Sequence, residues 1–402
     1  MPKGPSYTHA APQEHLLPRE QSASADKPIT ENRKLKTENR ATPLRIVITG
    51  GGTGGHLFPG IAVAQEFQGR FGAELTFITT PKAVTGQILE KYGFAWEAAQ
   101  SRAIYGKGFL GRVRALLEIP FSILRARARL QALKPHLVLG MGGHTSGPVG
   151  VAAHRLGIPL ALHEQNAIPG AANRWLARWA QRVFVSFPAT RSYLPVDKVV
   201  WTGNPIREEF YRAGHERPAE PFKVMVTGGS QGAHHLNMEI IKALPLLEDL
   251  KDRVSFLHLT GDADRDAVAA GYEQAGFAGE VAAFTPEMAK WLARAHLVVS
   301  RAGASTLAEL AALGRAAILV PYPFAANNHQ EFNARFFMDA GAGEMILNKD
   351  FTGRALADTI REMLAHPEKR EAMEAAARRL AKPDAAKEIV QGCLELIEGP
   401  HK

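Results

Sequence analysis

Residues 50–56 read Gly-Gly-Gly-Thr-Gly-Gly-His and carry the clearest chemical signal in the sequence. They follow an apolar run at residues 44–49, and the apolar pattern of a helix follows from Pro59. A glycine-rich turn between a strand and a helix lets backbone amides approach and hold an anion, commonly a phosphate. His56 ends this turn, where it could act as a general base, donate to a phosphate, or simply pack the turn.

Two later segments could hold phosphate in the same way. Residues 228–233, Gly-Gly-Ser-Gln-Gly-Ala, also follow an apolar run, and Ser230 offers both a hydroxyl and an amide. Residues 300–306, Ser-Arg-Ala-Gly-Ala-Ser-Thr, begin a helix whose dipole would favour a negative leaving group. Glu309, in the same helix, could accept hydrogen bonds from both hydroxyls of a ribose or merely complement the dipole.

Polar side chains follow two other strand-like runs. Residues 163–166, His-Glu-Gln-Asn, supply Asn166 as a ligand for a sugar hydroxyl and Glu164 as a second candidate base. Arg207 follows a Gly-Asn-Pro segment at residues 203–205 and could pair with a diphosphate or form an ordinary ion pair.

The elements that must position these groups alternate along the chain between short β-branched runs and helical patterns. We predict strands at residues 44–49, 74–79, 137–139, 159–162, 182–185 and 198–201, then at 222–227, 254–260, 281–284, 297–300 and 317–320. Such alternation is typical of parallel sheets with crossover helices. Both series open with a strand that ends in threonine and then glycines, which predicts two doubly wound Rossmann-like α/β domains facing a central cleft, with a hinge at residues 202–205.

Length and composition are consistent with this organisation. A chain of 402 residues is long enough for two domains with full cores, whereas residues 1–41 lack periodicity and predict a disordered extension. The single cysteine, Cys393, excludes an intrachain disulfide and a cysteine-based zinc site. No apolar run reaches the roughly 18 residues that a spanning helix needs, so we expect a protein that stays inside the cell and does not cross the membrane.

Charge indicates an anionic partner without naming it. The formal net charge of +8 would attract nucleic acid, an anionic membrane or phosphorylated substrates. Residues 107–134 combine apolar side chains with many arginines, which favours an anionic membrane surface, and Pro120 is expected to divide this segment into two helices. We expect no nucleic-acid partner. Asp262, Asp264 and Asp266 lie at a predicted helix start rather than in a ligand cluster, so no required metal is expected.

Dinucleotide binding is the weaker interpretation of the first loop. Residues 50–55 do match Gly-x-Gly-x-x-Gly, but the next predicted strand ends at Thr79 with no acidic residue to bind a ribose hydroxyl. A nicotinamide-dependent dehydrogenase would need such a residue.

Five motifs in order resemble the MurG family, the peptidoglycan N-acetylglucosaminyltransferases. They are residues 51–59, 163–166, 203–207, 228–233 and 300–309, and the resemblance runs from about Leu44 to the C-terminus. It implies a GT-B fold and inverting transfer of N-acetylglucosamine from UDP-N-acetylglucosamine to the C4 hydroxyl of the muramyl sugar of lipid I, the undecaprenyl-linked muramyl-pentapeptide, which gives lipid II. It further implies a peripheral enzyme on the cytoplasmic face of the bacterial membrane, without a cofactor, and with other cell-wall synthesis proteins as potential partners.

The resemblance also implies roles for individual residues. His56 would be the base, with Glu164 as the second choice, and Gly52 to His56 would receive the acceptor diphosphate while the edge of that loop touches the donor. Ser230 and the helix start would bind the UDP phosphates, Arg207 would face the nucleotide, Glu309 would bind the ribose, and the backbone of Thr285 would meet uracil. The implied donor-binding residues are Thr53, Gly54, Gly55, Asn166, Arg207, Ser230, Thr285, Ala304, Ser305, Thr306, Glu309 and Gln330.

The domain assignment follows from these roles. Residues 42–204, joined by a C-terminal helix within 382–402, would form the acceptor and membrane-binding domain, and residues 205–381 the UDP-sugar domain. Cys393 would then be a packing residue. Two other functions remain open at this point: a sugar-nucleotide or lipid-binding protein without catalysis, and another GT-B transferase that glycosylates diacylglycerol.

Overall fold

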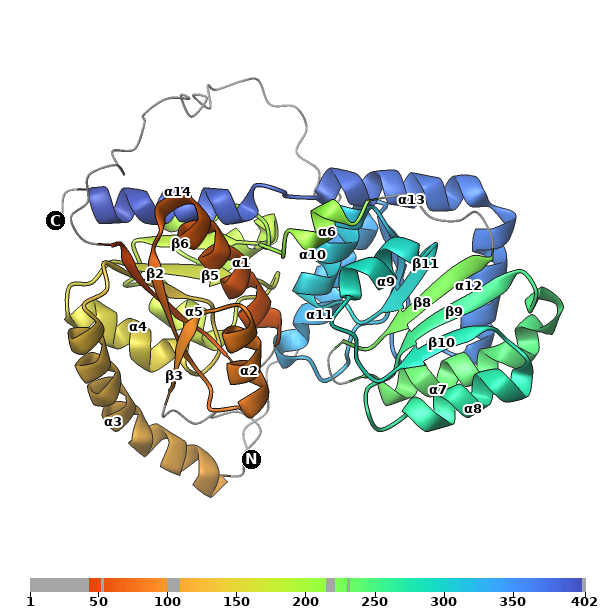
Figure 1. Ribbon diagram of the computed structural model, residues 1–402, viewed down its shortest axis with the longest axis horizontal. Helices are drawn as coiled ribbons and strands as arrows, with labels where there is room; N and C mark the ends of the chain where they lie inside the picture. The colour runs from red at the N-terminus through yellow and green to blue at the C-terminus, as the bar shows by residue number, and fades with distance from the viewer. Residues whose placement is uncertain (1–42, 52–53, 100–108, 215–220, 230–231, 400–402) are drawn as a thin grey trace, which may run out of the picture. The chain divides into compact units, whose positions relative to one another are not determined.

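The computed structural model describes residues 43–51, 54–99, 109–214, 221–229 and 232–399 (Figure 1). Residues 42–402 form one compact unit by their internal contacts. The extension predicted at residues 1–41 lies outside the described residues, as do the predicted site residues Gly52, Thr53 and Ser230.

The first sheet has seven parallel strands in the order β3-β2-β1-β4-β5-β6-β7. Its strands are β1 (Arg45–Thr49), β2 (Glu74–Thr79), β3 (Ala95–Ala98), β4 (Leu137–Gly140), β5 (Leu160–Glu164), β6 (Arg182–Val185) and β7 (Val199–Trp201). Its helices are α1 (Gly54–Phe71), α2 (Ala83–Lys91), α3 (Phe109–Leu133), α4 (Ser146–Arg155) and α5 (Ala171–Leu176), with the 3-10 helices η1 (Pro188–Tyr193) and η2 (Val196–Lys198). The strand order reverses between β1 and β4, so the loops after these two strands meet at the sheet's carboxyl edge.

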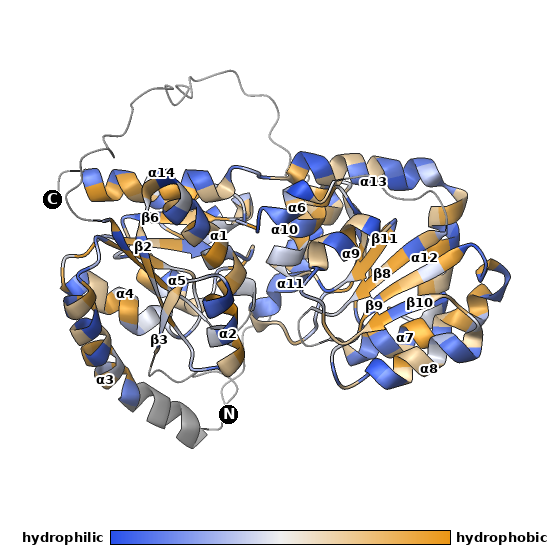
Figure 2. Ribbon diagram, viewed as in Figure 1, coloured by the Kyte–Doolittle hydropathy of each residue, from blue (hydrophilic) through white to orange (hydrophobic). Residues whose placement is uncertain are grey.

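Alternation along the first sheet separates two buried faces. Val47, Val138 and Val183 point toward one face, where they form a cluster with Ile123 and Leu130 of α3 and with α4 and α5. The neighbouring residues point the other way, and Gly60 of α1 lies against Ile48 and Phe77 there. Both faces are apolar because helices cover both, as parallel sheets require. The strands of both sheets are accordingly mostly hydrophobic in Figure 2.

The second sheet has six parallel strands in the order β10-β9-β8-β11-β12-β13. They are β8 (Phe222–Thr227), β9 (Val254–Leu259), β10 (Gly279–Ala282), β11 (Leu297–Ser300), β12 (Ala316–Leu319) and β13 (Gly343–Met345). The helices are α6 (Glu209–Arg212), α7 (His234–Ala243), η3 (Leu244–Leu250), α8 (Arg265–Ala275), α9 (Met288–Arg294), α10 (Ala304–Leu313), η4 (Ala326–Asn328), α11 (His329–Asp339), α12 (Gly353–Ala365) and α13 (Pro367–Leu380). Here the order reverses between β8 and β11.

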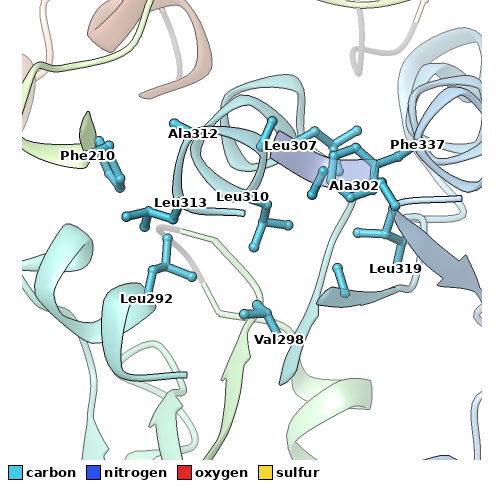
Figure 3. Packing of buried hydrophobic residues seen from close by; sticks show 14 of the residues in the cluster. Phe210, Leu292, Val298, Ala302, Leu307, Leu310, Ala312, Leu313, Leu319 and Phe337 are labelled. Carbon is cyan, nitrogen blue, oxygen red and sulfur yellow. The ribbon is translucent and has the colours of Figure 1, made fainter. Parts of the chain in front are cut away.

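Helix α10 is the centre of one buried face of the second sheet. Its Leu307, Leu310 and Leu313 pack among Val298 and Phe337, as Figure 3 shows. This spacing of three residues repeats the apolar side of a helix and fixes which side faces the sheet. The first turn of α10 is thereby held at the carboxyl end of β11.

The chain returns to the first sheet at its C-terminus. Helix α13 packs on α10 and β12, and α14 (Ala385–Glu398) then packs on α1, β4 and β6 (Figure 1). Gly392 of α14 allows this approach, because a Cβ there would lie 2.8 Å from the ring of Phe184. Cys393 is fully buried in the same helix, and burial raises the pKa of its thiol.

Most predicted strands are confirmed, and three details differ. Strands β3 and β13 were not predicted, and β10 begins and ends two residues before the predicted 281–284. The prediction that Pro120 splits residues 107–134 into two helices is wrong, because α3 continues through Pro120. Ile123, Ala126 and Leu130 of α3 are buried on the sheet, which offsets the hydrogen bond that proline removes.

Candidate functional site

The first part of the site lies where the first sheet reverses its strand order. The loop after β1 holds Gly50 and Gly51, and the loop after β4 holds Gly142 and Gly143, whose φ angles are 94° and 79°. A Cβ on Gly143 would lie 2.6 Å from the carbonyl oxygen of Gly51, so the two loops touch through glycine backbone. This second loop was not predicted, although the Gly-Met-Gly-Gly run at residues 140–143, after a predicted strand, was the available signal.

His56 lies in the first turns of α1, against this second glycine loop. A Cβ on Gly142 would lie 3.3 Å from Cε1 of the His56 ring, so glycine leaves room for the imidazole. Gly54 and Gly55 form the start of α1, which places their amides beside the histidine. The Ser146 hydroxyl donates to the carbonyls of Thr49 and Gly142 over 2.9 and 2.8 Å and joins the two loops.

Two side chains continue from His56 into the protein and end at a backbone carbonyl. His56 Nδ1 lies 2.8 Å from Gln165 Oε1, and Gln165 Nε2 lies 2.9 Å from His163 Nδ1. His163 Nε2 in turn lies 3.2 Å from the carbonyl oxygen of Gly203. Burial, which outweighs the hydrogen bond to Gly203, lowers the pKa of His163 to about 4, so this imidazole is neutral near pH 7.

Glu164, the other candidate base, is buried and fully engaged. Its Oε1 accepts from the backbone and side-chain amides of Asn166 over 3.0 and 3.4 Å. Its Oε2 accepts from the Gly170 amide over 3.0 Å and from Asn173 Nδ2 over 2.9 Å. These four hydrogen bonds occupy both carboxylate oxygens and leave little for a substrate hydroxyl, so the geometry favours His56.

Asn166 is tied to the second domain by Asn333, a residue that no sequence motif predicted. The fully buried Asn333 of α11 donates to Asn166 Oδ1 over 3.2 Å and to the Ala302 carbonyl over 3.1 Å. It also accepts from the Ala167 amide over 2.9 Å. Asn333 therefore fixes the candidate sugar ligand Asn166 relative to the loop that precedes α10.

The second part of the site lies at the reversal point of the second sheet. The loop after β8 contains Gly228, Gly229 and Gly232, and a Cβ on Gly232 would lie 1.9 Å from the Thr260 carbonyl oxygen. Gly232 also has a φ of 73°, so only glycine fits there without strain. Ser230, the predicted phosphate ligand of this loop, lies outside the described residues.

Helix α10 begins at the neighbouring loop. Ala304, Ser305 and Thr306 form its first turn, and the Ser305 hydroxyl accepts from Asn204 Nδ2 of the segment between the domains over 3.3 Å. No acidic residue lies in this first turn, and the unpaired amides of a helix start favour an anion.

Glu309 and Arg207 form a partly buried charged group near that helix start. Burial, opposed by Arg207 and reinforced by Glu209, raises the pKa of the Glu309 carboxyl to about 7. Arg207 pairs with Glu209 over 2.8 Å and stacks on Phe58 and Phe210 at 4.6 and 5.0 Å. Its buried Nε has no hydrogen-bond partner within the described part of the chain.

Two other predicted donor ligands lie in loops of the second domain. The Thr285 hydroxyl accepts from the Glu287 amide over 3.1 Å, in the segment between β10 and α9. Gln330 Oε1 accepts from the Tyr322 amide over 2.9 Å, so Gln330 at the start of α11 braces the loop after β12.

Metal ligands are not gathered in any of the described ranges, where no three His, Cys, Asp or Glu side chains are grouped to hold an ion. Of the three aspartates near residue 264, Asp264 instead binds His234 over 2.8 Å and Asn237 over 2.7 Å.

Each of the two domains that carry the site matches the model of a known protein family. Residues 46–185 match the glycosyltransferase family 28 N-terminal domain, and residues 223–389 match the glycosyltransferase family 28 C-terminal domain. Both matches coincide with the two doubly wound domains and confirm the predicted GT-B fold.

Relatives with the same name are similar over nearly their full length. The UDP-N-acetylglucosamine--N-acetylmuramyl-(pentapeptide) pyrophosphoryl-undecaprenol N-acetylglucosamine transferase of Myxococcus xanthus is 43% identical over 361 residues, which are 88% of this chain and 93% of that protein. The enzyme of that name from Anaeromyxobacter sp. strain Fw109-5 is 45% identical over 88% of this chain and 94% of its own. The crystal structure of Acinetobacter baumannii MurG superposes with a TM-score of 0.72 and 31% identity over 88% of this chain and 100% of that one. The chain belongs to glycosyltransferase family 28 and, within it, to the MurG family.

Proposed function

We propose that this chain transfers N-acetylglucosamine from UDP-N-acetylglucosamine to the C4 hydroxyl of the muramyl sugar in the undecaprenyl-linked muramyl-pentapeptide, forming lipid II for peptidoglycan synthesis. The observation that carries the proposal is that each sheet has functional groups at the point where its strand order reverses. An imidazole with a defined partner lies at one, and an anion-favouring helix start with a buried glutamate lies at the other. The full-length similarity to transferases of that name supports the same substrates.

The reaction would proceed by one direct displacement with inversion. His56 takes the proton of the C4 hydroxyl as its oxygen attacks the anomeric carbon, while the bond from that carbon to the UDP oxygen breaks. The departing diphosphate gains negative charge, which the α10 amides and Arg207 stabilise. These groups do what a divalent cation does in other sugar transferases.

The remaining assignments follow from position. Glu309 would bind the ribose hydroxyls, Thr285 the uracil, and Asn166 with Gln330 the sugar hydroxyls, while Ser230 would share the UDP phosphates. The first glycine loop, from Gly52 to His56, would receive the acceptor diphosphate. The amides of Gly54 and Gly55, in the helix start beside His56, support this last role.

We also propose that α3 attaches the enzyme to the cytoplasmic face of the bacterial membrane. None of the described helices is both long and apolar enough to cross a bilayer. On α3, however, Phe121 and Leu124 are 63% and 57% exposed, next to the exposed Arg125 and Arg127. Exposed apolar side chains beside cations are suited to an anionic lipid interface.

The activity is tested with radiolabelled donor and lipid I in the presence of EDTA. Labelled lipid II should form, and His56→Ala should slow it by roughly 100-fold or more, as expected for loss of a general base. Formation of labelled glycosyl-diacylglycerol instead of lipid II would reassign the acceptor. Binding of the donor without any transfer would indicate a sugar-nucleotide-binding protein without catalytic activity. Dependence of the transfer on added Mg²⁺ would contradict the proposal that α10 and Arg207 stabilise the leaving group.

The membrane assignment is tested by flotation with vesicles. Full-length protein should float with phosphatidylglycerol vesicles and much less with phosphatidylcholine vesicles. The double variant Phe121→Ser with Leu124→Ser should lose most of this binding, whereas Val196→Ser, which removes a 60% exposed side chain from η2, should retain it. Equal flotation of both variants would remove α3 from the attachment surface.

A further inference from the structure

His56, Gln165, His163 and the Gly203 carbonyl form a series of hydrogen bonds. The donor and the acceptor of each bond can be derived by starting from the Gly203 end. At the far end, the Gly203 carbonyl oxygen can only accept a hydrogen bond, so His163 Nε2, 3.2 Å away, must carry the proton. Because His163 is neutral near pH 7, its Nδ1 is then an acceptor.

The hydrogen bonds of Gln165, in the middle of this series, agree with His163 Nδ1 being an acceptor. Gln165 Nε2 faces His163 Nδ1 over 2.9 Å and also the His163 carbonyl oxygen over 3.3 Å. Both are acceptors, so the amide nitrogen of Gln165 must point toward them and its oxygen toward His56. The reverse amide orientation would place two oxygens face to face and leave His163 with the wrong tautomer for Gly203.

The donor in the hydrogen bond between His56 and Gln165 is therefore determined as well. Gln165 Oε1 accepts over 2.8 Å, so His56 Nδ1 must donate, and Nε2 of a neutral His56 keeps its lone pair. We propose that Gln165 and His163 are positioning residues that transmit the polarity of the Gly203 carbonyl to His56 and hold its Nε2 unprotonated as the base. This inference rests on the proposed role of His56 in transfer.

The Gly203 carbonyl is itself well fixed. The amides of Thr202 and Gly203 both donate to the Val185 carbonyl over 3.2 Å, and Gly203 has a φ of 84°. A Cβ on Gly203 would lie 2.5 Å from Lys382, where the chain crosses toward α14. The tautomer of His56 is thus set by backbone of the segment between the domains, more than 140 residues away in sequence from His56.

Among the residues that the structure describes, His56 forms no ion pair that could set its tautomer instead. The positive charge of a protonated His56 would act on His163 and contributes to lowering the pKa of His163. Glu164 lies between His163 and Gln165 in the sequence, but both of its carboxylate oxygens bind Asn166, Gly170 and Asn173 rather than His56.

The direct test is ring-nitrogen NMR on the full-length wild-type protein labelled with ¹⁵N-histidine. His56 should show a protonated Nδ1 and an unprotonated Nε2 at pH 7.5, and His163 the opposite tautomer. His56→Gln and His163→Gln variants assign the two signals. A protonated Nε2 on neutral His56, or a charged His163 at that pH, would overturn the proposal whatever the activity.

Kinetics separate positioning from packing. Gln165→Met keeps length but removes the acceptor, so kcat should fall about 10- to 100-fold while KM for the donor changes little. Gln165→Glu can still accept from His56 Nδ1, so it should recover much of kcat and, when ionised, move the acid limb of the pH profile to higher pH. Gln181→Met, at a glutamine that binds the Leu160 amide at the other end of β5, is the matched control and should retain kcat.

The outcomes also distinguish this inference from the proposed function. The expected tautomers together with a fully active His56→Ala variant would retain the relay and remove His56 as the base. An unchanged pH profile and kcat in both Gln165 variants would remove the relay from catalysis even if lipid II forms normally.

Discussion

Replacing Glu309 by glutamine tests whether a buried carboxyl with a raised pKa binds the nucleotide in its ionised form. Glu309 is 8% exposed on α10, and burial raises its pKa to about 7 from the ordinary 4.5. A raised pKa means that the folded protein binds this proton more tightly than the unfolded chain does. Stability from this group is therefore complete below about pH 4.5 and is lost as the pH rises through 7.

The size of the effect follows from the shift. A difference of about 2.5 units corresponds to roughly 3 kcal/mol at 1.36 kcal/mol per unit. Glutamine cannot ionise, so Glu309→Gln should gain about this much stability over the wild type at pH 8.5 and almost none at pH 4.5. For a domain of this size the gain corresponds to roughly 6 to 12 °C in melting temperature.

The assay compares melting temperatures of both proteins without ligand at the two pH values. Glu371→Gln, which changes an exposed glutamate of α13, is the control and should shift the melting temperature equally at both. Calorimetric titration with UDP in buffers of different ionisation enthalpy adds a second measurement. If bound ribose requires the carboxylate, about half a proton should leave Glu309 at pH 7, and none in the variant.

Two results would refute this reasoning. A stability difference between wild type and Glu309→Gln that does not change with pH would show that the carboxyl is ordinary in the folded protein. Undiminished UDP affinity in the variant would show that the ribose is bound elsewhere, even if the pH dependence is present. A more stable variant that binds UDP weakly is the expected combination, because binding sites commonly cost stability.

Three other changes have defined expectations. Gly232→Ala places a Cβ 1.9 Å from the Thr260 carbonyl at a φ of 73°, so KM for the donor should rise at least tenfold with less change for the acceptor; equal KM values would contradict a role in donor binding. Asn333→Ala leaves buried partners at Ala167 and Ala302 unsatisfied, so urea titration should show a loss of roughly 2 to 4 kcal/mol, and a loss below 1 would be inconsistent with these bonds. Cys393 is buried, so it should react with a thiol reagent only after unfolding, and rapid labelling of the native protein would place it at the surface.

The sequence predicted the sheets well where strands are buried on both faces. β1, β8 and β11 contain the apolar runs 46–48, 224–226 and 297–299, and such runs followed by a glycine-containing turn are recognisable without a structure. β3 and β13 are edge strands that read Ala-Trp-Glu-Ala and Gly-Glu-Met, with little burial to impose a pattern. Their pairing depends on the neighbouring strand rather than on their own residues.

The residues of the site were predictable from sequence motifs, whereas their hydrogen-bond partners were less so. The glycine turns and His56 are local signals, since each motif is contiguous in the sequence. The hydrogen bonds that give these residues their chemistry are not local: His56 and Gln165 are 109 residues apart, and Asn166 and Asn333 are 167 apart. Only the fold brings these pairs together, so the roles of Gln165 and Asn333 were not visible in either motif alone.

The four residues from His163 to Asn166 end β5 and continue just past it, and they serve two tasks because the side chains of an extended segment alternate. His163 and Gln165 point to one side and form the relay to His56, whereas Glu164 and Asn166 bind each other, and Asn166 meets Asn333 of the second domain. One segment therefore orients the proposed base and ties it to the domain that would hold the donor. A shift of one residue would exchange the two sets and destroy both, which gives the order His-Glu-Gln-Asn a physical reason at this strand end.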